Sequence, residues 1–173
     1  AAARLESRHG PRFARITLIG DGMTAARAER DIAAKGLTSV RRVGRLPYSD
    51  ALDSLAAADV ALGIFGTTGK AGRVVPHKVY QSMAMGIPTI SRRSRAVAEF
   101  FRDGEHLALV PPGDPAALAR AIEDLAGDPD RSRAMAERGR ASAIEQASPR
   151  PIGALLADAI QRARDRTAPR VKR

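Results

Sequence analysis

Residues suited to anion binding are concentrated in one short stretch of this 173-residue sequence. Gly66-Thr-Thr-Gly-Lys-Ala-Gly72 contains three glycines, and Lys70 and Arg73 add positive charge. Glycine lets backbone N–H groups approach a ligand closely, and such amides bind anions together with nearby cations. The stretch therefore predicts an anion site, with Gly69, Lys70 and Arg73 as candidate residues.

A strand, a helix and a second strand are predicted around this stretch. Asp59–Ile64 is an apolar run without alternation, which is typical of a parallel strand covered on both faces. Pro76 favours a helix start, and Gly86-Ile-Pro88 favours its end before an apolar strand that reaches Ser91. Because ligands of open α/β sheets collect at the carboxyl ends of strands, we expect the site at this edge of a sheet.

The rest of the chain also alternates between strand and helix patterns. Strands are predicted at residues 15–19, 40–43 and 107–110, and helices at 1–7, 23–35, 49–57, 94–101 and from Pro115 onward, with breaks near 128–129 and 148–151. This order predicts an α/β fold with a doubly wound parallel sheet and a helical C-terminus. We expect one domain over residues 1–165 and a disordered basic tail over 166–173.

The order and spacing of these pieces resemble the donor-binding C-terminal domain of GT-B glycosyltransferases of family 4, also called group 1. The matching pieces are Ile19-Gly-Asp-Gly22, the strand entry Ala58-Asp59, the helix Pro76-His-Lys-Val-Tyr-Gln-Ser-Met-Ala-Met-Gly-Ile-Pro88 and Val110-Pro-Pro-Gly-Asp-Pro-Ala-Ala-Leu118. The resemblance implies a Rossmann-like half of a GT-B fold. It also implies transfer, with retention, of a sugar from a nucleotide-diphosphate sugar to a saccharide or lipid-linked acceptor, with no cofactor and no metal.

The resemblance further implies two elements that this sequence lacks. A Rossmann-like domain opens with a strand that becomes central in the order 3-2-1-4-5-6, and no counterpart precedes Ile16 here. We therefore expect a fragment without that strand and without the N-terminal acceptor domain. Direct pairing of the two strands on either side of the gap is the alternative. Such a fragment would supply the donor half of a site, and it need not be active alone.

The predicted helix carries two residues to which the resemblance gives roles. Lys78 would stabilise the charge on a departing nucleoside diphosphate, whereas a surface lysine on a first helical turn opposes the helix dipole. Gln81 takes the place of a glutamate that binds ribose hydroxyls, and its amide oxygen can still accept a hydrogen bond. The counterpart of the family's other glutamate falls on Arg73, which reverses its charge. Lys78 and Arg73 are thus the catalytic candidates, and the donor-sugar contact is in doubt.

Two glycine turns offer further contacts. Gly44-Arg45-Leu46 follows a predicted strand, where the resemblance places backbone contacts to the nucleotide base; an ordinary connection with a solvated Arg45 agrees equally well with the sequence. Gly20-Asp-Gly22 lacks a third glycine at the fingerprint spacing, so a plain turn is favoured over a diphosphate contact.

The net charge of +10 raises the alternative of nucleic-acid binding. The cations are spread along the chain, aromatic residues are too scarce, at 3%, for a base-stacking platform, and no nucleic-acid-binding signature is present. We therefore do not expect nucleic acid as a partner, and an anionic membrane surface fits the charge better. A non-catalytic nucleotide-binding module of the same fold is the main alternative to an enzyme.

Cysteine is absent and the three histidines are scattered, so the sequence predicts neither a disulfide framework nor a metal site. The apolar runs are shorter than a membrane span. We expect a cytoplasmic protein, with peripheral binding to the inner face of the membrane as an alternative.

Overall fold

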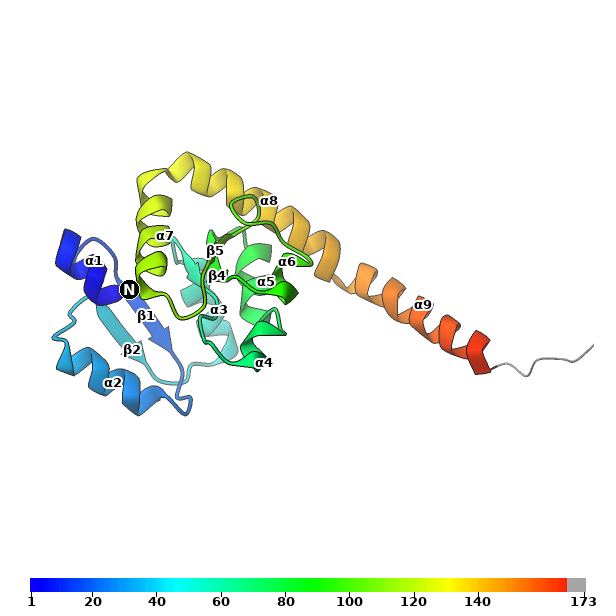
Figure 1. The fold of residues 1–173 in the computed structure, drawn as a ribbon, viewed down its shortest axis with the longest axis horizontal. Helices are drawn as coiled ribbons and strands as arrows, with labels where there is room; N and C mark the ends of the chain where they lie inside the picture. Colours follow the sequence, from blue (N-terminus) through cyan, green and yellow to red (C-terminus); the bar gives the residue numbers. More distant parts are fainter. Residues whose placement is uncertain (168–173) are drawn as a thin grey trace, which may run out of the picture.

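The computed structural model describes residues 1–167, in which strands and helices alternate and further helices follow at the C-terminal end (Figure 1). The elements are α1 (Ala2–His9), β1 (Ile16–Ile19), α2 (Ala25–Ala34), β2 (Val40–Val43), α3 (Tyr48–Ala56), β3 (Ala61–Leu62), α4 (Gly69–Gly72), α5 (His77–Ala84), β4 (Thr89–Arg92), α6 (Arg95–Ala98), β5 (Ala108–Val110), α7 (Pro115–Gly127), α8 (Pro129–Ala147) and α9 (Pro149–Thr167).

The strands form two separate parallel sheets. β1 pairs with β2, with Ile16 opposite Val40, and β4 lies between β3 and β5 in the other sheet. Within residues 1–167 no hydrogen-bonded ladder joins β1 to β3, so direct pairing across this gap does not occur. The parallel strands and intervening helices confirm the predicted α/β class and helical C-terminus.

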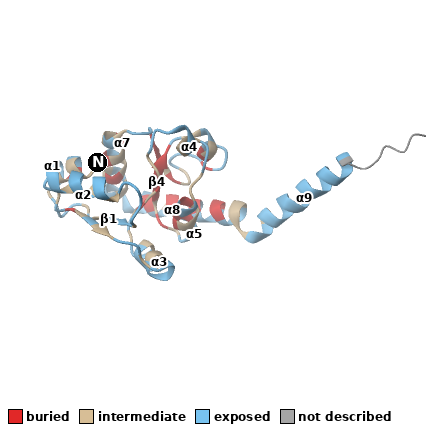
Figure 2. Ribbon diagram, turned by 90° about the horizontal axis from the view of Figure 1, so that it is seen from below, coloured by how far each residue is buried: buried red, intermediate tan, exposed pale blue. Residues whose placement is uncertain are grey.

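The core surrounds β4, whose four residues are all buried. Leu109 and Val110 are neighbours on β5 but pack into different apolar clusters. Since successive strand residues point to opposite faces, the two clusters cover the two faces of the three-stranded sheet. One cluster contains Val79 and Met83 of α5, and the other contains residues of α1 and α7. Figure 2 shows buried residues gathered on β4 and on the neighbouring part of α8.

Local signals placed the late helices correctly. Asp114 caps α7, because its carboxylate accepts hydrogen bonds from the amides of Ala116 and Ala117 at 2.8 and 2.9 Å. The predicted breaks separate α7 from α8 and α8 from α9. α9 extends away from the sheets and continues through residue 167, so the first two residues of the predicted tail are helical, and residues 168–173 lie outside the described part of the chain (Figure 1).

Two predictions around the glycine stretch need correction. The strand expected over Asp59–Ile64 is assigned only to Ala61–Leu62, although the amide of Gly63 still donates to Ile90. The predicted loop contains the short helix α4, which begins where the Thr68 hydroxyl accepts a hydrogen bond from the amide of Ala71 at 3.3 Å. The helix predicted at 94–101 is likewise shorter, since α6 ends at Ala98.

Candidate functional site

The loops that follow β3 and β5 touch at the carboxyl edge of the three-stranded sheet. The amide of Gly113 donates to the carbonyl of Phe65 at 2.9 Å. Gly113 has a φ of +70°, and a Cβ at this position would lie 2.7 Å from Cγ2 of Thr67. Only glycine fits both this backbone conformation and this close approach. The contact fixes the start of the glycine stretch against the end of β5.

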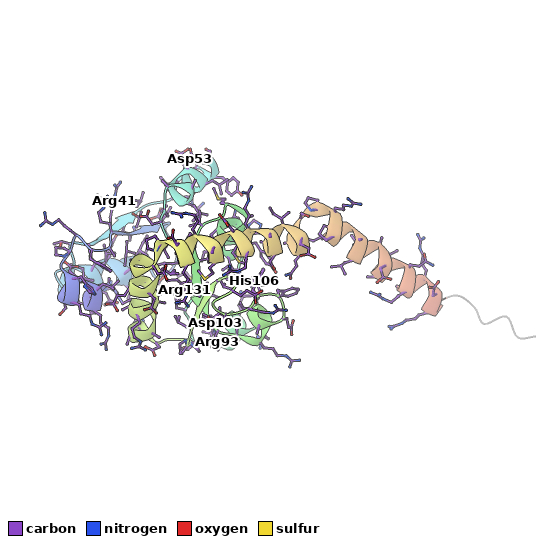
Figure 3. All side chains as sticks on the ribbon, turned by 90° about the horizontal axis from the view of Figure 1, so that it is seen from above. Arg41, Asp53, Arg93, Asp103, His106 and Arg131 are labelled. Atoms are coloured by element: carbon purple, nitrogen blue, oxygen red, sulfur yellow. The ribbon has the colours of Figure 1, made fainter. Side chains whose placement is uncertain are left out.

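Arg92, the last residue of β4, is hydrogen-bonded to the backbone of the glycine stretch. Its Nη1 donates to the carbonyl of Gly66 and, at 3.5 Å, to the carbonyl of Thr68. The residue is 8% exposed. Its neighbour Arg93 is exposed and pairs with Asp103 at 2.5 Å (Figure 3). Sequence analysis missed Arg92; its position directly after a buried strand, at the carboxyl edge, was the available signal.

The cations predicted within the glycine stretch are exposed. Gly69 and Lys70 open α4, and Arg73 follows it, with its amide donating to the carbonyl of Lys70 at 3.1 Å. The Arg73 side chain folds back, so that its Nη1 lies 3.6 Å from the position of a Cβ on Gly69. Neither Lys70 nor Arg73 forms an ion pair with a carboxylate of residues 1–167. Their charge is therefore available to an anion.

Lys78 lies on the first turn of α5, after Pro76 at the N-cap. Its side chain reaches solvent, yet surrounding protein atoms displace part of the water around the ammonium and lower the pKa of Lys78. The ammonium is thus reached by solvent and is also partly desolvated. A bound anion there would restore part of the lost hydration energy.

Gln81, on the next turn of α5, is half-buried and connects two elements. Its Nε2 donates to the hydroxyl of Tyr48 at 2.7 Å, and Tyr48 is the first residue of α3. Within the described part of the chain no hydrogen bond reaches its amide oxygen, which is the acceptor that the ribose prediction requires. This contact brings the segment after β2 to the side of α5.

The Gly44–Arg45 turn belongs to the two-stranded sheet. The amide of Arg45 donates to the Asp21 carboxylate at 2.8 Å, and Asp21 also pairs with Arg42 at 3.2 Å. The Arg45 amide and the Arg42 guanidinium both hold the pKa of Asp21 below its ordinary value. A Cβ on Gly44 would lie 3.3 Å from this carboxylate. The partners of the Asp21 carboxylate are thus within the two-stranded part, and the Arg45 amide already donates to that carboxylate.

The structure brings together some of the predicted residues and separates others. Gly69, Lys70 and Arg73 share one loop, and Lys78 and Gln81 share one helix. Among residues 1–167 no hydrogen bond or ion pair links Gly44 or Arg45 to the loop at 66–73. The described residues also contain no group of three or more His, Asp or Glu arranged to hold a metal ion.

A cavity of about 440 Å³ lies elsewhere, between Phe100, Gln146 and the first turns of α9. Its lining is almost entirely apolar, so it offers no group for an anion. No helix within residues 1–167 combines the length and apolarity needed to cross a membrane.

Comparisons with known proteins bear on this arrangement. The family model described as glycosyl transferases group 1 matches residues 1–128. The lipopolysaccharide core biosynthesis glycosyltransferase LpsE of Rhizobium meliloti is 31% identical over 133 residues, which cover 77% of this chain and 37% of LpsE. The chain thus spans little more than a third of this curated relative.

Solved structures show the same fold. The complex of HepE from Anabaena with UDP aligns with a TM-score of 0.80 at 19% identity, over 92% of this chain and 44% of HepE. The C-terminal domain of the group 1 family protein LpcC from Francisella tularensis aligns with a TM-score of 0.65 at 18% identity, over 84% of this chain and 74% of that domain. The sheet order, the helical C-terminus and the matched family model together show that this chain belongs to the group 1 glycosyl transferases and forms one Rossmann-like half of their GT-B fold.

Proposed function

We propose that this chain binds the nucleoside diphosphate of an activated sugar and supplies the donor half of a retaining glycosyltransferase. The observation that carries the proposal is the glycine stretch at the carboxyl edge of the three-stranded sheet, where Lys70 and Arg73 have no carboxylate partner within residues 1–167. Its placement agrees with the rule for ligands of open parallel sheets. The fold shared with HepE, whose structure holds UDP, supports the same ligand class.

In this proposal the chain contributes charge stabilisation rather than acid–base chemistry. Negative charge develops on the diphosphate as the bond to the sugar breaks, and fixed cations near it lower the barrier. Lys78 and Arg73 are assigned this role, and Gly69 and Lys70 bind the diphosphate. Gln81 is assigned to the ribose through its amide oxygen, and Gly44 and Arg45 to the nucleotide base. Neither a cofactor nor a metal is required.

The acceptor, a saccharide or a lipid-linked sugar, would bind outside this chain. We infer that the gap between β1 and β3 receives one further parallel strand in the full-length protein. Both strands leave an edge unpaired within the described residues, and Leu18 and Ile19 on β1 are 38% and 41% exposed. An acceptor domain preceding that strand would complete the site.

A non-catalytic nucleotide-binding module is the second candidate. The feature that favours it is Arg73, on which the resemblance places the counterpart of a family glutamate when positions are counted back from Gln81. Binding of nucleotide without transfer would follow if this change removed the donor-sugar contact.

Titration calorimetry of the purified chain with UDP, GDP and ADP tests the proposal. At least one of the three should bind, should be displaced by its nucleotide sugar and should bind with only a mild dependence on salt. A polyelectrolyte partner would instead give a steep salt dependence. If none of the three nucleotides binds, the assignment of this edge as a donor site is wrong.

A further inference from the structure

Within residues 1–167, Arg92 is the one charged residue with less than a tenth of its surface exposed. Its charge has no carboxylate partner within 4.0 Å in that part of the chain. The partners of its guanidinium are carbonyl oxygens, those of Gly66, Thr68 and Arg93. Carbonyls satisfy the N–H groups but do not neutralise the charge, so burying this cation costs free energy.

The glycine stretch surrounds this guanidinium from both ends. Nη1 contacts the carbonyl of Gly66 at its start, and Nη2 lies 3.5 Å from the position of a Cβ on Gly72 at its end. The structure contains no cis peptide bond among the described residues. In a trans peptide the N–H points away from the preceding C=O. The amides of Thr67 and Gly69 therefore point away from Arg92.

These two amides have no acceptor within residues 1–167. They belong to the same loop as Lys70 and Arg73, whose charges are also unpaired there. Free backbone amides beside cations form a concave site for an anion with several oxygens. The carbonyl of Thr68 also accepts a hydrogen bond from the amide of Gly72 at 3.3 Å, whereas the carbonyl of Gly66 has Arg92 as its donor within residues 1–167. Removing Arg92 would therefore release the peptide plane between Gly66 and Thr67 and lose the direction of the Thr67 amide.

We propose that Arg92 is the positioning residue of a pyrophosphate site, in which it orients the amide of Thr67 outward beside that of Gly69, and its buried charge is compensated by the bound anion. The inference rests on the proposed function for the identity of the natural ligand, and on the geometry alone for the class of anion. Arg92 is not assigned a contact with the sugar or with the bond that breaks.

Inorganic pyrophosphate is the probe, because it carries neither base nor sugar. Its affinity for the purified chain is measured by calorimetry for the parent, Arg92→Met, Arg92→Lys and Arg93→Met. Arg92→Met keeps the length of the side chain and should lower the affinity roughly 10- to 100-fold. Arg92→Lys keeps the positive charge but not the planar guanidinium, so its affinity for pyrophosphate should lie between those of Arg92→Met and the parent. Arg93→Met is the matched control, because Arg93 is exposed and paired with Asp103, and it should change the affinity less than about 2-fold.

Three results would overturn the inference. The first is an affinity of Arg92→Met for pyrophosphate within about 2-fold of that of the parent. The second is equal affinities of Arg92→Met and Arg92→Lys, and the third is an affinity of Arg93→Met as low as that of Arg92→Met. If Arg92→Met does not fold, the affinity of Arg92→Lys is the test, and an affinity equal to that of the parent overturns the inference. A parent that binds pyrophosphate but no nucleoside diphosphate contradicts the proposed function and leaves the role of Arg92 standing. A parent that binds neither overturns both.

Discussion

The two sheets of this molecule differ in a way that their sequences do not suggest. β1 has the more apolar sequence, Ile16-Thr-Leu-Ile19, yet only Ile16 is even half-buried. β4, Thr89-Ile-Ser-Arg92, contains two polar residues and an arginine, and all four residues are buried. The difference arises because α5 and α8 cover one face of β4 and α1 and α7 cover the other, whereas β1 has only β2 beside it in its sheet. Burial is therefore decided by the covering layers and neighbouring strands rather than by the hydrophobicity of the strand itself.

The candidate site residues follow the same division. The loop with Lys70 and Arg73, the buried Arg92 and the helix with Lys78 and Gln81 all belong to the three-stranded part. The two-stranded part contributes Gly44 and Arg45, whose loop is engaged by Asp21. The part that is packed on both faces thus holds most of the candidate site residues, and the proposed electrostatic role would need such fixed positions.

The largest effect should come from removing an apolar side chain from the middle of a strand, and it should differ between the two sheets. Ile90 is fully buried on β4, so Ile90→Ala should lower the free energy of unfolding by about 2–5 kcal/mol. Leu18 is 38% exposed on β1, so Leu18→Ala should cost about 1 kcal/mol or less. Urea unfolding of both variants provides the measurement. Equal losses would show that β1 is packed as tightly as β4, contrary to the structure.

A smaller effect is expected on nucleotide affinity. Lys78→Ala should weaken binding of the nucleoside diphosphate that the chain prefers about 10-fold, and Gln81→Ala should weaken it by a smaller factor. Both residues lie near the surface, so the unfolding transition should not change. Arg41→Ala is the control from the two-stranded part and should change affinity less than about 2-fold, because Arg41 is exposed on β2 and has no ion pair within residues 1–167. A loss at Arg41 as large as that at Lys78 would move the phosphate site toward β2.

The smallest effect is a local loss of stability at acid pH, and it should be confined to the two-stranded part. Glu6 of α1 accepts hydrogen bonds from the hydroxyls of Ser39 and Thr38 at 2.6 and 2.8 Å, and these bonds lower the pKa of Glu6 to about 2. A depressed pKa means that the stabilisation is complete above the ordinary value of 4.5 and is lost as pH falls toward 2.

Amide hydrogen exchange at Thr38 and Ser39 should therefore accelerate, relative to that of Ile90, as pH falls from 4.5 toward 2. Glu6→Gln, which cannot titrate, should abolish this differential change. A parallel pH response at Ile90 would mean that the two sheets unfold together at acid pH.

The elements that local signals fix could be predicted from the sequence. Asp114 and Pro115 specify the start of α7 by themselves, through capping and a fixed φ, and the structure has this start. The strand at 40–43 was also placed correctly. The length of β3 was not predictable in the same way, because the ladder depends on where β4 runs beside it.

The candidate site also has features that depend on distant parts of the chain and could not be predicted from local sequence. Glycine disfavours helices, so α4 could not be inferred from Gly66–Gly72, even though Thr68 is a good cap. Arg92 stands beside Arg93 in a run rich in arginine, and its position directly after the predicted strand is the one feature of that run that distinguishes the buried residue from the exposed one. Their environments differ because Arg92 extends under a loop more than twenty residues earlier in the chain. The roles of Lys78, Arg73 and Gln81 remain predictions.

Gly113 has a consequence for any redesign of this half of the GT-B fold. The space between its α-carbon and the methyl group of Thr67 is too small for even one more carbon atom. The height at which the turn at Gly66–Gly72 rests is thus set by a residue more than forty positions away, on a different strand end. Libraries that vary this turn to test the proposed donor site should leave position 113 untouched, since a side chain there would lift the whole turn and hide any gain made within it.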